Sequence, residues 1–132
     1  MTLDWSKFQT LSGSQDKNFE LLCRGIIRHT FGQYGRFVSH ANMAGVEFYL
    51  ELNNDCALGK KDRVFGWQCK WFEIEAGKPL GKNRRSNIED GIKKTKKYHP
   101  NVTDWILWTK YTLTKSDQDW FNAIKTDLNL YL

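Results

Sequence analysis

The apolar residues between positions 14 and 32 recur at the spacing of an amphipathic helix. They fall on one side of the predicted helix: Phe19, Leu22, Cys23, Ile26 and Ile27. Gly32 follows them and is expected to end the helix. Residues 1–13 are interpreted as a polar lead-in in which Trp5 and Phe8 form a short apolar anchor.

Three later segments have the pattern of β-strands. In residues 46–52 apolar and polar side chains alternate, which is typical of a strand buried on one face. The apolar face of this strand is made of Val46, Phe48, Leu50 and Leu52. Residues 64–74 are apolar enough for a central strand, and residues 104–110 form the third strand. Residues 33–44 are interpreted as loop or turn.

Two further helices are predicted in the second half of the chain. Ser86 is the expected cap of the first, with Glu89 completing a capping box, and Pro100 is expected to stop it. Its inner stripe is made of Ile88, Ile92 and Thr95. Thr114 or Ser116 is the expected cap of the last helix. The inner face of that helix is made of Trp120, Phe121, Ile124 and Leu128.

The predicted elements follow the order helix, strand, strand, helix, strand, helix. A helix between the second and third strands is a crossover connection, which joins parallel strands. The sequence therefore predicts the α/β class, with a central mixed sheet flanked by helices. The length of 132 residues fits a single domain.

Composition narrows the class of protein. Hydrophobic residues make up 40% of the chain, and only two prolines occur, which excludes a disordered or fibrous chain. No run of about 18 apolar residues exists, and the first residues lack the apolar core of a secretory signal. Cys23, Cys56 and Cys69 have no CxxC spacing, so we expect reduced thiols, no structural zinc and a cytoplasmic location.

Basic charge is concentrated in one segment. The chain has 20 Lys and Arg against 15 Asp and Glu, a net charge of +5. Residues 78–97 hold eight basic and two acidic residues, so the rest of the chain is close to neutral. Such a patch attracts phosphates, although charge runs are also common on ordinary solvated helix faces. The expected nucleic-acid contacts are Lys82, Arg84, Arg85, Lys93 and Lys97.

Polar residues interrupt the apolar pattern of the first two predicted strands and are candidates for a functional site. Gln68 and Lys70 are two residues apart in the second strand and therefore share a face. Burying them without partners is costly, and Glu47 on the neighbouring strand would satisfy the lysine. The same combination would make a hard-oxygen metal site with an adjacent cation.

The ordered set of these residues resembles the PD-(D/E)xK restriction-endonuclease-like superfamily. The matching residues are Glu20 in the first helix, Gly45-Val46-Glu47 at the start of a strand, and Gln68-Cys69-Lys70 in the next strand. The Gln-x-Lys variant is closest to the Mrr-like branch. The resemblance covers roughly residues 17–110 and implies a restriction-endonuclease-like core.

The resemblance also implies a Mg²⁺-dependent endonuclease acting on DNA, with Mn²⁺ able to substitute for Mg²⁺. Glu47 would be the principal metal ligand, and Glu20 would add a second carboxylate. Gln68 would contribute its amide oxygen or hold a metal-bound water. Lys70 would orient the attacking water or stabilise the charge that develops on the phosphate.

A wider context follows from the same resemblance. Domains of this kind are often N-terminal effectors of bacterial restriction and anti-phage defence proteins. Because the sequence begins at Met1 and stops at Leu132 directly after a predicted helix, we expect a domain excised from a longer chain. Its expected partners are DNA, further copies of itself, and fused sensor or ATPase domains, but no membrane.

The acids of the proposed site have alternatives. Glu20 lies four residues before Arg24, so that a surface ion pair on the helix would also explain it. Glu51 shares the polar face of Glu47 and is the rival metal-binding acid. A solvated strand face would explain both Glu47 and Glu51 without a metal.

The polar residues of the second strand also have a structural alternative. Gln68 and Lys70 could form a buried polar pair that stabilises the sheet. Cys69 points to the opposite face without a neighbouring histidine, so we expect a core residue rather than a nucleophile. Because Gln68 replaces an acid, an inactive nuclease-fold module for nucleic-acid binding or assembly is the alternative function.

Overall fold

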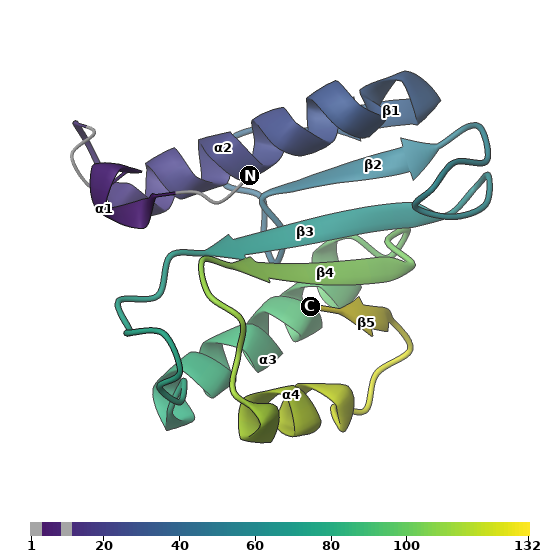
Figure 1. Ribbon diagram of the computed structural model, residues 1–132. Helices are drawn as coiled ribbons and strands as arrows, with labels where there is room; N and C mark the ends of the chain where they lie inside the picture. Colours follow the sequence, from purple (N-terminus) through teal and green to yellow (C-terminus); the bar gives the residue numbers. More distant parts are fainter. Residues whose placement is uncertain (1–3, 9–11) are drawn as a thin grey trace.

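A computed structural model describes residues 4–8 and 12–132 and shows a five-stranded mixed sheet with helices on both faces (Figure 1). Helices α1 (Trp5–Phe8) and α2 (Gln15–Phe31) cover one face. Helices α3 (Lys82–Tyr98) and α4 (Lys115–Asn122) cover the other. The predicted α/β class with a mixed sheet between helices is therefore confirmed. None of the helices in the described residues is long and apolar enough to cross a membrane.

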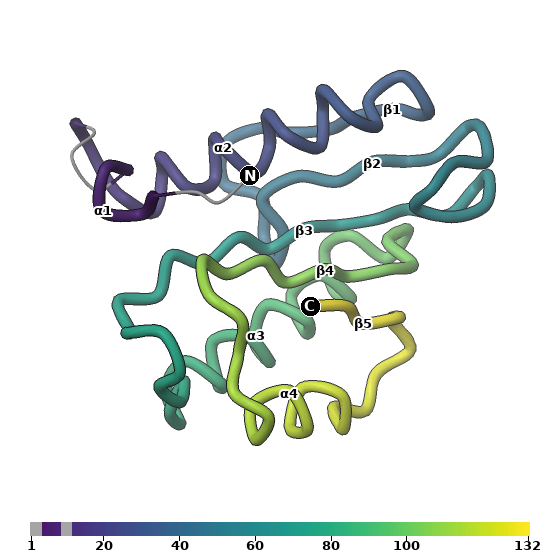
Figure 2. The backbone as a smooth tube through the Cα atoms, viewed as in Figure 1, coloured from purple at the N-terminus to yellow at the C-terminus, as the bar shows by residue number. Residues whose placement is uncertain are grey.

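The strands lie in the sheet in the order in which they occur in the chain. They are β1 (Gly35–Val38), β2 (Phe48–Leu52), β3 (Val64–Lys70), β4 (Asp104–Thr109) and β5 (Asn129–Tyr131). The first three are antiparallel, whereas β4 is parallel to β3 and β5 is parallel to β4. The predicted crossover is confirmed, because α3 carries the chain back from the end of β3 to the start of β4 (Figure 2).

This topology collects several element ends at one edge of the sheet. Strands β3 and β4 end there, β2 begins there, and the N-terminal part of α2 lies over the same edge (Figure 1). Helix α3 also begins on this side, since it runs antiparallel to the strands that it connects. The edge therefore brings together residues that are far apart in the sequence.

Two strands were not predicted. Residues 33–44 contain β1 after a short 3₁₀ helix (Gly32–Tyr34), so that the loop interpretation is wrong for part of that segment. Strand β5 has only three residues and is an outermost strand of the sheet, next to β4. Both are too short to show a period-2 pattern. The predicted strand 64–74 ends at Lys70, where the chain leaves the sheet.

Helix α2 agrees closely with its prediction. Ser14 caps it by accepting a hydrogen bond from the Lys17 backbone N–H, and Gly32 follows its last residue. Its buried side chains are Phe19, Cys23 and Ile27, whereas Ile26 of the predicted stripe is 43% exposed. The predicted anchor is confirmed, because the rings of Trp5 and Phe8 pack against Trp71. The remaining lead-in residues 1–3 and 9–11 lie outside the described residues.

The last two helices differ from their predictions at one end each: α3 begins earlier and α4 ends earlier. Helix α3 begins at Lys82 after Gly81, so Ser86 lies inside the helix and is not its cap. The predicted stripe of Ile88, Ile92 and Thr95 is fully buried. Thr114 caps α4 as expected, but the helix ends at Asn122. Two residues assigned to its inner face therefore follow it: Ile124 and Leu128.

The alternation in β2 holds within the strand but not before it. Phe48, Leu50 and Leu52 pack in the core under α2 as predicted. Val46 instead packs in the core on the α3 side of the sheet. The prediction that Val46 shares their face is wrong. Strand β2 begins only at Phe48, and the backbone bends at Glu47, so the alternation of side chains does not extend back to Val46.

Candidate functional site

Gly45 and Glu47 occupy the point where the chain enters β2. Gly45 has a φ of 81°, and a Cβ there would overlap backbone atoms of Gly91 and Thr95 on α3. Its backbone therefore touches the helix directly. Two residues later, the Glu47 N–H donates to the carbonyl of Trp67 at 2.8 Å. This pairing fixes Glu47 beside β3.

The Glu47 side chain is held against β3 and largely removed from water. Its Oε2 accepts a hydrogen bond from the Cys69 backbone N–H at 2.9 Å. Burial raises the pKa of Glu47 to about 7, an effect opposed by this hydrogen bond and by the nearby Lys70 ammonium. A carboxyl group that changes charge near neutral pH is typical of functional sites.

Glu20 of α2 lies close to Glu47. Its negative charge adds to the effect of burial in raising the pKa of Glu47. The Glu20 side chain is 22% exposed, and its closest ion pair is to Lys17 at 3.9 Å. Arg24, the alternative partner, instead donates to the hydroxyl of Ser39 at 2.9 Å. The structure thus brings Glu20 to the site and not into the ion pair with Arg24.

Gln68 is the most buried of the four residues, with 6% of its surface exposed. Its amide packs on Gly91 of α3, where an added Cβ would approach the amide atoms to 2.6–2.9 Å. The Nε2 group donates to the carbonyl of Gly45 at 3.4 Å. Within the described residues, its Oε1 accepts no hydrogen bond, which is a costly state for a buried oxygen.

Lys70 is the last residue of β3 and is half-buried. It shares the strand face of Gln68, as the spacing predicted. Among residues 4–8 and 12–132 it has no ion-pair partner within 4.0 Å, although its charge lowers the pKa of Glu47 against the dominant effect of burial. Its ammonium therefore stays available at the edge of the sheet.

The Cys69 thiol and the Glu51 carboxylate both lie outside the site. Cys69 is buried in the core under α2, where contact with the Cys23 thiol and burial raise its pKa. Its predicted core role is confirmed. Glu51, the rival acid, lies at the other end of β2 and accepts two hydrogen bonds from Arg36 and one from Asn101. Hydrogen bonding to Arg36 lowers its pKa, so Glu51 is a surface ion-pair residue.

The donor set suits a hard cation, but it is small. Glu20 and Glu47 supply carboxylates, and the Oε1 of Gln68 supplies an unsatisfied amide oxygen. Oxygen ligands of this kind fit Mg²⁺ or Mn²⁺. No group of three or more His, Cys, Asp or Glu that could hold a metal occurs in the described part of the chain. The structure brings together the two carboxylates, whereas the Gln68 amide packs on Gly91 on the α3 side of the sheet. A metal here would therefore depend first on Glu20, Glu47 and water.

The predicted nucleic-acid contacts divide into two groups. Arg84 donates to the carbonyls of Leu80 and Glu73, and Arg85 donates to the buried carboxylate of Asp117. Both arginines are thus engaged in the fold. The other three side chains are exposed lysines on α3 that form no ion pair with any described residue: Lys82, Lys93 and Lys97.

A further cation at the same edge was missed by the sequence reasoning. Lys110 directly follows β4, and its Nζ lies 4.0 Å from the ring centroid of Trp71. Thr109 is paired with Lys70, so the two lysines follow neighbouring parallel strands at their carboxyl ends. The signal in the sequence is the position of Lys110 directly after a strand predicted to be parallel to the strand of Lys70. The carboxyl ends of parallel strands meet on the same side of the sheet.

Comparison with known proteins does not assign the chain to a family. No model of a known protein family matches the sequence, and no curated protein shows significant similarity to it. These comparisons leave the resemblance to the restriction-endonuclease-like superfamily untested.

Proposed function

We propose that this chain is a metal-dependent endonuclease domain with a restriction-endonuclease-like core that hydrolyses phosphodiester bonds in DNA. The observation that carries the proposal is the proximity of Glu20 on α2 and Lys70 on β3 to Glu47, which directly precedes β2. Their types and order match the motif that the sequence resembles. The mixed sheet with a parallel crossover is compatible with such a core.

In this proposal Glu20 and Glu47 would hold a Mg²⁺ ion, and the Oε1 of Gln68 would turn away from Gly91 to reach it. The bound ion would polarise a phosphoryl oxygen and lower the pKa of a water ligand. Because a cation favours the ionised carboxylate, the raised pKa of Glu47 would fall when the metal binds. The otherwise unsatisfied oxygen of Gln68 would gain a partner.

Lys70 is the residue that acts on the phosphate or on the water. Water attacks the phosphorus, the bond between phosphorus and the leaving sugar oxygen breaks, and that oxygen takes up a proton. The Lys70 ammonium orients the water or stabilises the negative charge that develops on the phosphate. Lys82 and Lys110, near the same edge, would neutralise neighbouring phosphates of the strand.

Cleavage of supercoiled plasmid in Mg²⁺ or Mn²⁺ tests the proposal. We expect the wild type to nick the plasmid, and Lys70→Met, which keeps the apolar stem, to reduce the rate at least about 100-fold. Lys61→Met, in the turn at the opposite end of the sheet, is the matched control and should keep the wild-type rate. Equal cleavage by Lys70→Met and the wild type would refute the role of Lys70.

The biological role proposed is that of an effector in a prokaryotic defence system. Cutting both strands of DNA requires two sites, so we propose that the active form contains at least two copies. Size-exclusion chromatography with light scattering, with and without DNA, tests this assembly. A monomer that cuts both strands at once would contradict it.

A second candidate function is a catalytically inactive module that binds nucleic acid or mediates assembly. The observation in its favour is Gln68, which is packed on Gly91 and replaces an acid, so the site holds only two carboxylates. This function predicts DNA binding without cleavage in Mg²⁺ or Mn²⁺. A mobility-shift assay run beside the plasmid assay distinguishes the two functions.

A further inference from the structure

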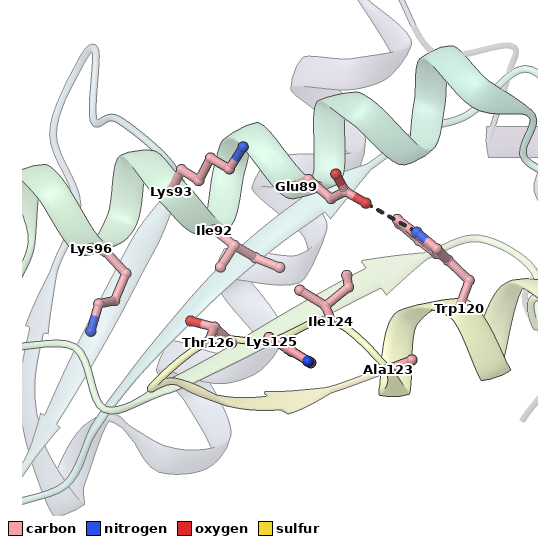
Figure 3. A pocket seen from close by; sticks show the side chains of 9 residues that line it. All are labelled: Glu89, Ile92, Lys93, Lys96, Trp120, Ala123, Ile124, Lys125 and Thr126. Atoms are coloured by element: carbon pink, nitrogen blue, oxygen red, sulfur yellow. Dashed lines mark hydrogen bonds between the residues drawn. The ribbon is translucent and has the colours of Figure 1, made fainter.

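A cavity lies on the far side of α3 from Gln68. It has a volume of about 540 Å³ and is formed between α3 and the segment from Trp120 to Thr126 (Figure 3). Volumes of about 300–1,000 Å³ are typical of small-molecule sites. Gln68 packs on the inner side of α3 at Gly91, so this cavity is not part of the proposed nuclease site.

The floor of the cavity is apolar and rigid. Ile92 is almost fully buried, and Ile124 faces it from the opposite wall. The indole of Trp120 is fixed on two sides. Its Nε1–H donates to the Oε1 of Glu89 at 3.0 Å, and the Arg85 guanidinium lies 5.1 Å from its ring centroid. A wall held in this way is preformed for a flat apolar group.

The rim of the cavity carries positive charge. Lys93 and Lys96 extend from α3, and Lys125 comes from the opposite wall (Figure 3). Lys96 forms an ion pair at 2.9 Å with Asp127, a residue that does not line the cavity. Within the described residues, Lys93 and Lys125 form no ion pair. Two lysines without ion-pair partners beside an apolar floor suit an anionic ligand with an apolar body.

The only acid in the lining adds a specific polar requirement. One carboxylate oxygen of Glu89 is used by Trp120, and the other accepts no hydrogen bond from a described residue. It can therefore accept N–H groups from a ligand. The lining has lysines but no arginine, which favours a phosphate dianion bound by point charges over a carboxylate bound by a fork of two donors.

We propose that this cavity binds a free nucleoside monophosphate whose base carries N–H donors, such as a guanine nucleotide. The phosphate lies at the rim beside Lys125, and Lys93, whose ammonium points away from the opposite wall in Figure 3, turns toward it on binding. The base covers the apolar floor, and Glu89 accepts its N–H groups. The cavity is an open groove between two chain segments, and its volume is that of one small molecule, which favours a free nucleotide over a nucleic-acid strand. The proposal does not rest on the proposed nuclease function, although Lys93 is shared with the predicted DNA contacts.

Binding of guanosine 5′-monophosphate, measured by calorimetry and by the shift of the Trp120 indole N–H signal in NMR, tests the proposal. Ala123→Trp fills the cavity from an exposed position, and Lys125→Glu reverses one rim charge. We expect each variant to weaken binding at least about tenfold. The controls are Asn122→Trp and Lys94→Glu, exposed neighbours outside the lining, which should bind like the wild type.

The comparison ligands decide the chemistry. Guanosine and inorganic phosphate should each bind at least about tenfold more weakly than the nucleotide, because each lacks one half of the ligand. The proposal is wrong if the nucleotide does not bind at millimolar concentration, or if Ala123→Trp and Lys125→Glu bind it like the wild type. It is also wrong if phosphate alone binds equally well, or if a ten-nucleotide single strand binds in its place.

Discussion

At the scale of single residues, the proposed function depends on one partly buried carboxyl group. Glu47 is fixed by two backbone interactions with β3, through its own N–H and through its side chain. Burial raises its pKa to about 7, so that the protonated form is favoured far more than in an exposed glutamate. A protein that keeps a carboxyl group in such an unfavourable place gains nothing in stability from it. This is the physical reason to expect a cation there.

The pH dependence of stability tests this description of Glu47. Its pKa is about 7 in the folded protein against 4.5 as the ordinary value, so between these pH values the folded protein binds more protons than the unfolded chain. The contribution of Glu47 to stability therefore falls as pH rises through this window. We expect Glu47→Gln to gain about 1–3 kcal/mol relative to the wild type between pH 5 and pH 8.

Urea unfolding at several pH values measures the effect. Glu51→Gln is the matched control, because the pKa of Glu51 is lowered by its hydrogen bonds from Arg36. The stability that Glu51 contributes is present above pH 4.5 and is lost as pH falls, which is the opposite sign. Parallel stability profiles for Glu47→Gln and the wild type would show that Glu47 is not perturbed.

At the scale of elements, the site depends on the close approach of the chain before β2 to α3. Gly45 and Gly91 allow this approach from the two sides, and Gln68 packs on Gly91. The same approach explains why Val46 lies on the other side of the sheet from Phe48. A glycine before the acid is thus a packing requirement as well as part of a motif.

Substitution of Gly45 tests the approach against simple backbone strain. Gly45 and Gly77 have almost the same φ, 81° and 80°, but only Gly45 has atoms where a Cβ would lie. We expect Gly77→Ala to cost about 1 kcal/mol and Gly45→Ala about 2–4 kcal/mol in the free energy of unfolding. Equal losses in chemical denaturation would mean that Gly45 is needed only for its conformation.

Sequence patterns predicted the elements with a long apolar period and failed at short or irregular ones. Helix α2 follows from its repeated apolar spacing, and the crossover between β3 and β4 follows from the helix predicted between two strands. Strands β1 and β5 have four and three residues, too few for a period to appear. The start of α3 was misplaced because Ser86 resembles a cap, while Gly81 has no side chain to signal one.

At the scale of the whole molecule, the basic residues of segment 78–97 have two roles: some stabilise the fold and others remain exposed for binding. Arg85 and Asp117 join α3 to α4 through a carboxylate that is fully buried. Burial opposes the charge of Asp117, but hydrogen bonds from Leu80, Arg85 and Thr114 outweigh it and hold the pKa of Asp117 below its ordinary value. The sequence showed a charge surplus but not which cations were already neutralised, because Asp117 is distant in the chain.

The salt dependence of DNA binding distinguishes the lysines that contact phosphates from the arginine that stabilises the fold. With three exposed lysines on α3 in contact with phosphates, log K should fall against log salt with a slope of about −2 to −3. Lys82→Ala should reduce this slope by about one, whereas Lys61→Ala should leave it unchanged. Arg85→Ala should lower stability without changing the slope. Filter binding at several salt concentrations measures each slope, and an unchanged slope in Lys82→Ala would remove that residue from the interface.

The most direct test of the central claim is plasmid cleavage by Glu47→Gln and Glu51→Gln, measured side by side at pH 8 in Mg²⁺ and in Mn²⁺. The two acids lie on one strand, and only Glu47 is placed with Glu20 and Lys70. We predict that Glu47→Gln loses cleavage by at least about 100-fold and that Glu51→Gln cleaves like the wild type. Cleavage by Glu47→Gln at the wild-type rate would contradict the proposed site.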